Sequence, residues 1–162
     1  MKTVIIALLA FYCNCSFCQT TPDYDNIKLI DKGDYQVAER NVMQAANYIL
    51  STPFEKDDLT RLKSLQFIIK WMTGTPDFSF SLDEMATKMA KGNDDVLGVY
   101  MVCMTKYCLE NKASSKDGRA VKLNSIKMLL SYCENANNKL KLTKQLKKLS
   151  EANQNGELEK EL

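Results

Sequence analysis

Residues 57–76 read DDLTRLKSLQFIIKWMTGTP, and this stretch decides the fold class. Its apolar residues recur at steps of three and four, which is the spacing of one face of an α-helix. They are Leu62, Leu65, Ile69 and Met72, with Ile68 and Trp71 beside them. The two aspartates at the start are typical helix caps, and a glycine followed by a proline is typical of a helix end. The stretch therefore predicts an amphipathic helix.

The same spacing recurs on both sides of this stretch. The further stripes are Ala38–Ile49, Leu82–Met89, Val96–Cys108, Val121–Cys133 and Leu142–Leu149. No long stretch alternates with period two, so nothing indicates a sheet. We predict an all-α protein of five to six helices in antiparallel hairpins. Pairs of helices would span roughly 35 to 40 residues, so an irregular bundle and a short helical-repeat-like stack both fit.

The first 18 residues have the pattern of an export signal. Lys2 is the only charge in the first 22 residues, and an apolar run follows from Thr3 to Cys13. This run is too short to cross a hydrocarbon core of ~30 Å as a helix. A charged start, a short apolar run and small residues are typical of a secretory signal peptide. We predict cleavage before Gln19, a periplasmic or extracellular protein, and no transmembrane segment in the mature chain.

The remaining chain divides into three parts. Residues 19–32 are polar and contain Pro22, so we expect an N-terminal extended arm, with Ile27, Leu29 and Ile30 touching the core. Residues 33–152 carry the apolar stripes and form a single helical domain. Residues 153–162 are polar, and we expect a flexible tail there.

The absence of histidine excludes many kinds of chemistry. The chain has 162 residues, no His and a formal net charge of +2. Without His it lacks the commonest general base, every Ser/His or Cys/His nucleophile pair and every His-bearing metal site. Adjacent acidic residues occur at 57–58, 83–84 and 94–95, but each pair begins a predicted helix, where it acts as a cap. We predict a non-enzymatic protein without a metal ion or cofactor.

Three of the six cysteines follow the predicted cleavage site. Cys103 and Cys108 point about 140° apart on one predicted helix, so they should not bond to each other. If the helices on either side of residues 114–118 form a hairpin, Cys133 comes level with one of them. We predict a disulfide between Cys103 and Cys133, with three small buried hydrophobic residues as the alternative.

Residues 70–80 read KWMTGTPDFSF and contain the only tryptophan and two phenylalanines. A rigid loop with aromatic anchors is a reasonable binding surface, so Trp71, Phe78 and Phe80 are candidate contacts for an apolar partner. The alternative is that these rings fill the core and hold the loop in place.

A longer string carries a resemblance. Residues 70–84 read KWMTGTPDFSFSLDE, and the N-terminal segment ends in SFCQ at 16–19. Together they resemble small uncharacterised exported helical proteins of Bacteroidota-type bacteria. The resemblance implies export, and it implies no particular mechanism because no activity is attached to that group.

Charge is unevenly distributed along the chain. Residues 112–148 contain ten basic and two acidic residues, whereas residues 19–111 contain ten basic and fourteen acidic ones. We expect the last predicted helix to contact an acidic partner or anionic surface through Lys141, Lys144, Lys147 and Lys148. The segment lacks interleaved aromatic residues, so we do not expect nucleic acid. The alternative is a solvated lysine face.

These observations predict an exported helical module that binds a protein or cell-envelope component. The alternative is a carrier of a small apolar ligand, held in a cavity lined by methionines and aromatic residues. The candidate cavity residues are Met72, Met85, Met89 and Met101.

Overall fold

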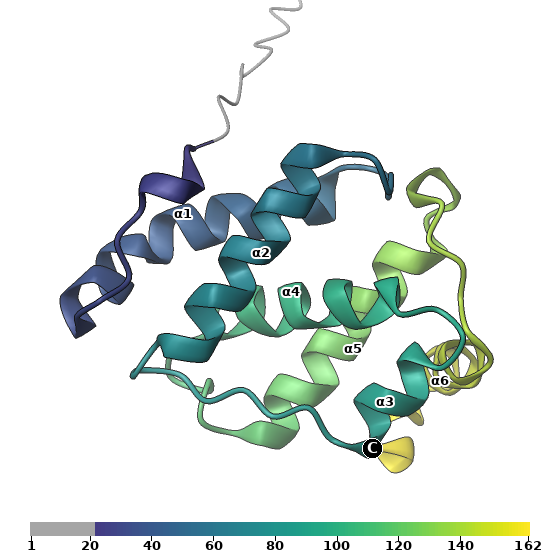
Figure 1. Cartoon of the computed structure of the whole chain (residues 1–162). Coiled ribbons are helices and arrows are strands. Elements are labelled where there is room, and N and C mark those ends of the chain that lie inside the picture. Colours follow the sequence, from purple (N-terminus) through teal and green to yellow (C-terminus); the bar gives the residue numbers. More distant parts are fainter. Residues whose placement is uncertain (1–21) are drawn as a thin grey trace, which may run out of the picture.

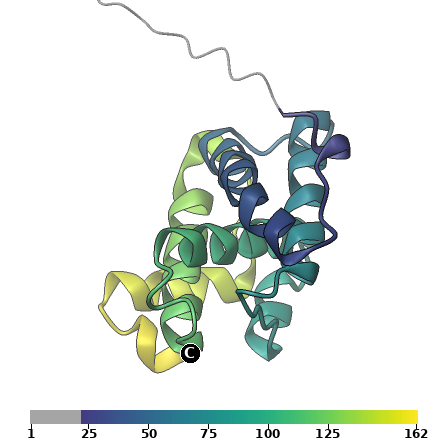
Figure 2. The same cartoon turned by 90° about the vertical axis from the view of Figure 1, so that its left-hand side faces the viewer.

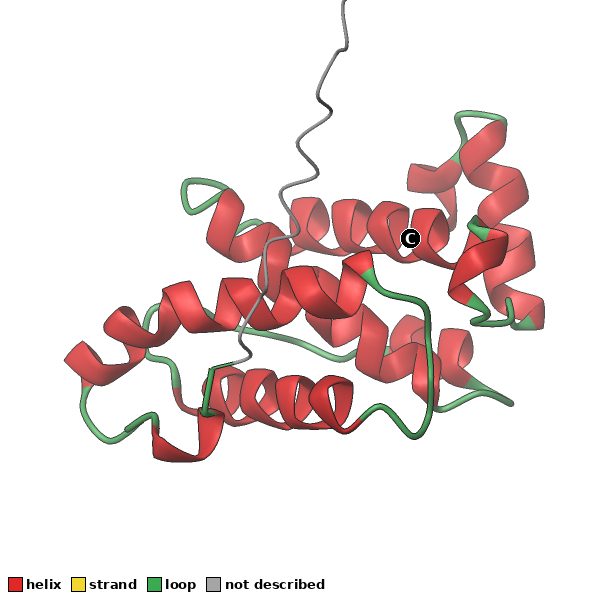
Figure 3. Ribbon diagram, turned by 90° about the horizontal axis from the view of Figure 1, so that it is seen from above, coloured by secondary structure: helices red, strands yellow, loops and turns green. Residues whose placement is uncertain are grey.

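The structure is a computed structural model, and it describes residues 22–162. These residues form six α-helices and three short 3-10 helices, with no strand among them (Figures 1 and 3). The helices are α1 (Lys32–Ser51), α2 (Leu59–Gly74), α3 (Glu84–Ala90), α4 (Asp95–Glu110), α5 (Gly118–Glu134) and α6 (Lys144–Gln154). The predicted all-α class is confirmed. The predicted signal peptide, its cleavage site and Cys13, Cys15 and Cys18 lie outside the described residues.

Local capping explains where the helices begin. The side chains of Asp58, Asp83, Asp117 and Thr143 each accept a hydrogen bond from a backbone N–H in the first turn of their helix. At α1 the cap is Asp31, which forms a capping box with Asp34. These bonds satisfy N–H groups that have no partner within the helix. The predicted capping role is confirmed for the acidic pairs at 57–58 and 83–84, through Asp58 and Asp83, whereas Asp94 at the start of α4 makes no side-chain capping bond.

Helix α4 is the centre of the bundle. It packs against α1, α2, α3 and α5. Figure 2 shows α1 and α2 on one side of the molecule and α5 and α6 on the other. Helix α6 is seen end-on in Figure 1, so it lies across the direction of α4. The result is an irregular bundle.

The core has two halves, and α4 faces both. Val102 and Leu109 of α4 pack with α1, α2 and the N-terminal segment. Tyr100, Cys103 and Met104 of the same helix pack with α3, α5 and α6. A helix with buried residues on opposite sides has no clear amphipathic pattern, as expected for a central helix.

The buried face of α2 is shifted by one position along the sequence from the predicted face. The predicted stripe was Leu62, Leu65, Ile69 and Met72, whereas the buried residues are Arg61, Ser64, Phe67, Ile68 and Trp71. Leu62 is 48% exposed. The prediction counted only apolar residues, but two positions of the real face hold an arginine and a serine.

Arg61 is buried because the surrounding groups satisfy its guanidinium. Its Nη1 donates to the carbonyl of Ile49 at 3.0 Å, and its Nη2 donates to the hydroxyl of Tyr132 at 2.8 Å. The guanidinium lies 5.1 Å from the ring centre of Phe54 and 5.6 Å from that of Tyr132. Tyr132 in turn donates to the carbonyl of Thr52. Arg61 thereby connects the end of α1, the start of α2 and α5.

The N-terminal arm is packed rather than simply extended. Tyr24, in the 3-10 helix Tyr24–Asn26, is buried and stacks on Phe67 with ring centres 4.6 Å apart. Ile27 and Leu29 pack against the core as predicted. Ile30 does not, since it is 77% exposed.

The C-terminal residues are not the free tail that their polar composition predicted. Gly156 has a φ of +72°, a conformation that favours glycine, and the N–H of Glu157 donates to the carbonyl of Ala152. This turn brings Leu158 back into the core, where it is only 2% exposed. The helical domain therefore continues past residue 152. No helix within residues 22–162 is long and apolar enough to cross a membrane.

Candidate functional site

The aromatic residues at the end of α2 and in the α2–α3 connection differ in how deeply they are buried. Trp71 is fully buried, and its Nε1 donates to the carbonyl of Tyr35 at 3.0 Å. Its ring lies 5.5 Å from that of Phe78 and 6.1 Å from that of Phe80. The prediction that Trp71 contacts a partner at the surface is wrong, because the large ring fills the core of the α1–α2 half. Phe78 and Phe80 are partly buried and pack against both halves.

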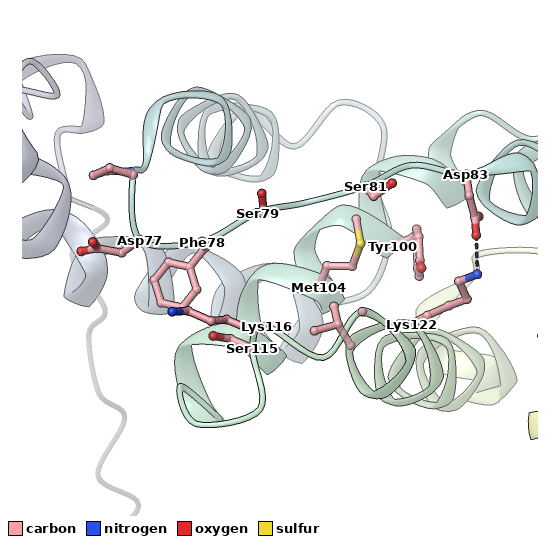
Figure 4. A pocket seen from close by; sticks show the side chains of 13 residues that line it. Asp77, Phe78, Ser79, Ser81, Asp83, Tyr100, Met104, Ser115, Lys116 and Lys122 are labelled. Carbon is pink, nitrogen blue, oxygen red and sulfur yellow. Dashed lines mark ion pairs between the residues drawn. The ribbon is translucent and has the colours of Figure 1, made fainter.

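Phe78 also lines a surface cleft. The loop of residues 75–83 runs across α4 and the start of α5 and borders a cleft of about 610 Å³, here called the Phe78 cleft. Figure 4 shows Tyr100 and Met104 between Phe78 at one end and Asp83 with Lys122 at the other. The remaining lining residues are Pro76, Asp77, Ser79, Ser81, Ser115, Lys116, Gly118 and Val121. The cleft combines an apolar floor with a polar rim, which is typical of ligand sites.

Tyr100 is the least ordinary residue of the cleft. Its side chain is only 2% exposed, and its hydroxyl makes no hydrogen bond to any residue in 22–162, yet it is not sealed from the cleft. Burial raises the pKa of the Tyr100 phenol, and the charge of Asp83 raises it further. The phenol is therefore neutral at physiological pH and can donate a hydrogen bond to a bound group.

The carboxylates of the cleft are already paired. Asp83 caps α3 and forms an ion pair with Lys122. Burial works to raise the pKa of Asp83, but Lys122 and the backbone N–H of Ala86 together hold it below its ordinary value. At the other end, Asp77 pairs with Lys32 at 2.8 Å and accepts a hydrogen bond from Gln36. Neither carboxylate is left as an unpaired base.

The predicted lysines divide into two groups. Lys141 and Lys144 line a second groove, here called the lysine groove, together with Lys56, Lys91 and Lys139. Lys147 and Lys148 are exposed on α6 outside that lining, and Lys148 pairs with Glu161. Lys56, Lys91 and Lys139 were not predicted: the first two come from distant parts of the chain, and Lys139 lies in the segment before the last predicted helix.

The predicted Cys103–Cys133 disulfide is not formed in the structure. Cys103, Cys108 and Cys133 are free and buried in the half of the core around α4, α5 and α6. Burial raises the pKa of Cys103, and the nearby Cys133 raises it further. All three pack as small apolar residues, which was the alternative interpretation.

We expect the three thiols to be inert in the folded protein. The thiolate is the reactive species, and burial raises the pKa of Cys108 to about 11 and that of Cys133 to about 12. Iodoacetamide at neutral pH should leave all three unmodified, whereas addition of urea should make all three react. Mass spectrometry of the peptides measures the modification. Labelling of Cys133 before unfolding, or a Cys103–Cys133 peptide in an unreduced sample, would contradict this arrangement.

The methionines do not occupy the predicted positions. Met89 is fully buried, and Met72, Met85 and Met101 pack against the core. The methionine that lines the Phe78 cleft is Met104. The ligand cavity predicted around the other four is therefore not the cleft that the structure contains.

Neither a metal-binding cluster nor a similar protein indicates what binds in the Phe78 cleft. Among residues 22–162, no group of three or more His, Cys, Asp or Glu side chains is arranged to hold a metal ion. The chain matches no protein-family model, no curated protein and no solved structure.

Proposed function

We propose that the chain is an exported, non-enzymatic module whose Phe78 cleft binds an apolar group of a protein or cell-envelope partner. The observation that carries the proposal is the unpartnered hydroxyl of Tyr100 in an otherwise apolar floor. The hydroxyl opens to the cleft, so a ligand that supplies an acceptor atom can replace solvent there and be oriented by a direct hydrogen bond from Tyr100. Support for export comes from the pattern of residues 1–18.

The shape of the cleft favours a group that belongs to a larger partner. Its floor offers apolar contact to Phe78, Met104 and Val121, while exposed residues such as Ser79 and Lys116 leave it open to solvent. An aliphatic or aromatic side chain could enter from outside, with a carbonyl or ether oxygen placed at Tyr100. An enclosed carrier site is less well supported, because the methionines predicted to line it pack in the core.

A binding role fits the side chains better than catalysis does. The chain has no histidine, and the two carboxylates of the cleft are each paired with a lysine. The serines of the cleft therefore have no neighbouring base that would activate them as nucleophiles.

The test is an NMR titration of the ¹⁵N-labelled protein with N-acetyl-leucinamide and N-acetyl-phenylalaninamide. We expect shifts in the backbone amides of residues 77–83 and 118–122. Tyr100→Phe removes only the hydroxyl and should weaken binding roughly 3- to 10-fold, the value of one hydrogen bond. The matched control is Tyr107→Phe, whose hydroxyl pairs with Ser114 outside the cleft. Equal binding by both variants, or shifts elsewhere on the surface, would refute the proposal.

A further inference from the structure

The lysine groove is separate from the Phe78 cleft and is assembled from three segments. It has a volume of about 580 Å³ and lies between the α1–α2 loop, the α3–α4 turn and the chain leading into α6. These segments lie on the right-hand side of Figure 1. Five lysines and a single carboxylate line it, the latter from Asp95. The groove therefore concentrates positive charge from parts of the sequence that are far apart.

Most of this charge is not neutralised. Lys56 pairs with Asp95 at 3.4 Å, and Lys139 pairs with Glu55. Lys91, Lys141 and Lys144 form no ion pair with any residue of the described part of the chain. Like charges gathered in a recess raise the local potential and attract anions.

The recess is held in shape by hydrogen bonds between the segments. The N–H of Phe54 donates to the carbonyl of Asn138 at 2.8 Å, and the side-chain amide of Asn93 donates to the carbonyl of Lys141 at 3.3 Å. The hydroxyl of Thr143 donates to the carbonyl of Met89 at 2.7 Å. A groove whose walls are tied together in this way can bind a ligand without first ordering the backbone.

The backbone at Lys139 has an unusual conformation. Its φ is +59°, and within residues 22–162 it is the sole residue other than glycine with a positive φ. Glycine adopts this conformation readily, whereas lysine does so at a cost. The ion pair of Lys139 with Glu55 joins this turn to the α1–α2 loop and helps to hold the wall of the groove.

We propose that the lysine groove binds a compact molecule that carries two or more phosphate groups. The concave shape and the convergence of lysines from three segments match several charges close together. A flat anionic membrane fits less well, because Lys147 and Lys148 of α6 do not line the groove. This site is independent of the Phe78 cleft, so either proposal can fail alone.

The first test uses isothermal titration calorimetry with inorganic tripolyphosphate at low ionic strength. Lys91→Gln combined with Lys141→Gln should raise the Kd by roughly tenfold or more. The matched control combines Lys28→Gln with Lys70→Gln, which removes the same charge from exposed positions outside the groove lining. We expect the control to bind nearly as the unaltered protein does. An equal loss in both double variants would show that only the net charge matters and would overturn the proposal.

A second variant separates binding from stability. Lys139→Gly removes a charge and relieves the backbone, so it should weaken tripolyphosphate binding while Tm stays the same or rises. A lysine with a purely structural role would not give this combination. Unchanged binding by this variant contradicts a role for Lys139, and binding to phosphatidylglycerol vesicles without binding to tripolyphosphate would assign the groove to a membrane surface instead.

Discussion

Arg61→Met is expected to lower the free energy of unfolding by about 2–4 kcal/mol, since it removes the donors on which several buried acceptors depend. Methionine keeps much of the side-chain volume, so the loss reflects hydrogen bonding more than packing. The carbonyl of Ile49 and the hydroxyl of Tyr132 would lose their donor inside the bundle. The guanidinium also stops contacting the rings of Phe54 and Tyr132. Urea unfolding followed by circular dichroism measures the change.

Two further variants test the cause. Arg40 is exposed on α1, so Arg40→Met should change stability by no more than about 0.5 kcal/mol. Arg61→Lys keeps the charge, but an ammonium lacks the planar fork that reaches Ile49 and Tyr132 together, so an intermediate loss is expected. If Arg61→Met and Arg40→Met cost the same, the buried hydrogen-bond network does not stabilise the fold.

Trp71→Ala is expected to destabilise the protein by about 3–5 kcal/mol, the usual cost of removing a buried aromatic side chain. The ring is fully buried against Phe78 and Phe80, and its N–H is bonded to the carbonyl of Tyr35. Its loss should also loosen the loop that borders the Phe78 cleft. Thermal unfolding by calorimetry measures the loss of stability.

Leu62→Ala is the matched comparison, because Leu62 belongs to the stripe that the sequence predicted to be buried. It is 48% exposed, so the change should cost less than about 1 kcal/mol. A larger cost for Leu62→Ala than for Trp71→Ala would mean that the predicted face of α2, and not the observed one, is buried.

The helices could be predicted because their signals are local. Asp58, Asp83 and Asp117 begin helices through bonds to backbone groups within three residues. Gly74 is the last residue of α2 and has no positive φ; a Cβ there would clash with the ring of Tyr35. Pro76 follows directly after the C-cap Thr75 and is a local stop signal for α2. Such features need no knowledge of the rest of the fold.

What could not be predicted depends on partners far away in the sequence. The face of α2 is set by Arg61, whose burial requires a tyrosine 71 residues later. The lysine groove needs three segments to meet, and the Phe78 cleft needs a floor from α4. Gly156 is a local signal for the turn that brings Leu158 into the core. The prediction gave more weight to the polar residues around Gly156 and therefore expected a free tail.

The position of α4 has a consequence for how the protein loses its structure. Helix α4 has buried residues in both halves of the core. If α4 separates from one half, that half loses the helix against which its apolar residues pack. Partial opening that frees only one half would expose apolar surface on the shared helix. The two halves are thus expected to melt together as a single cooperative unit, with the amides of α4 among the last to exchange with solvent deuterium.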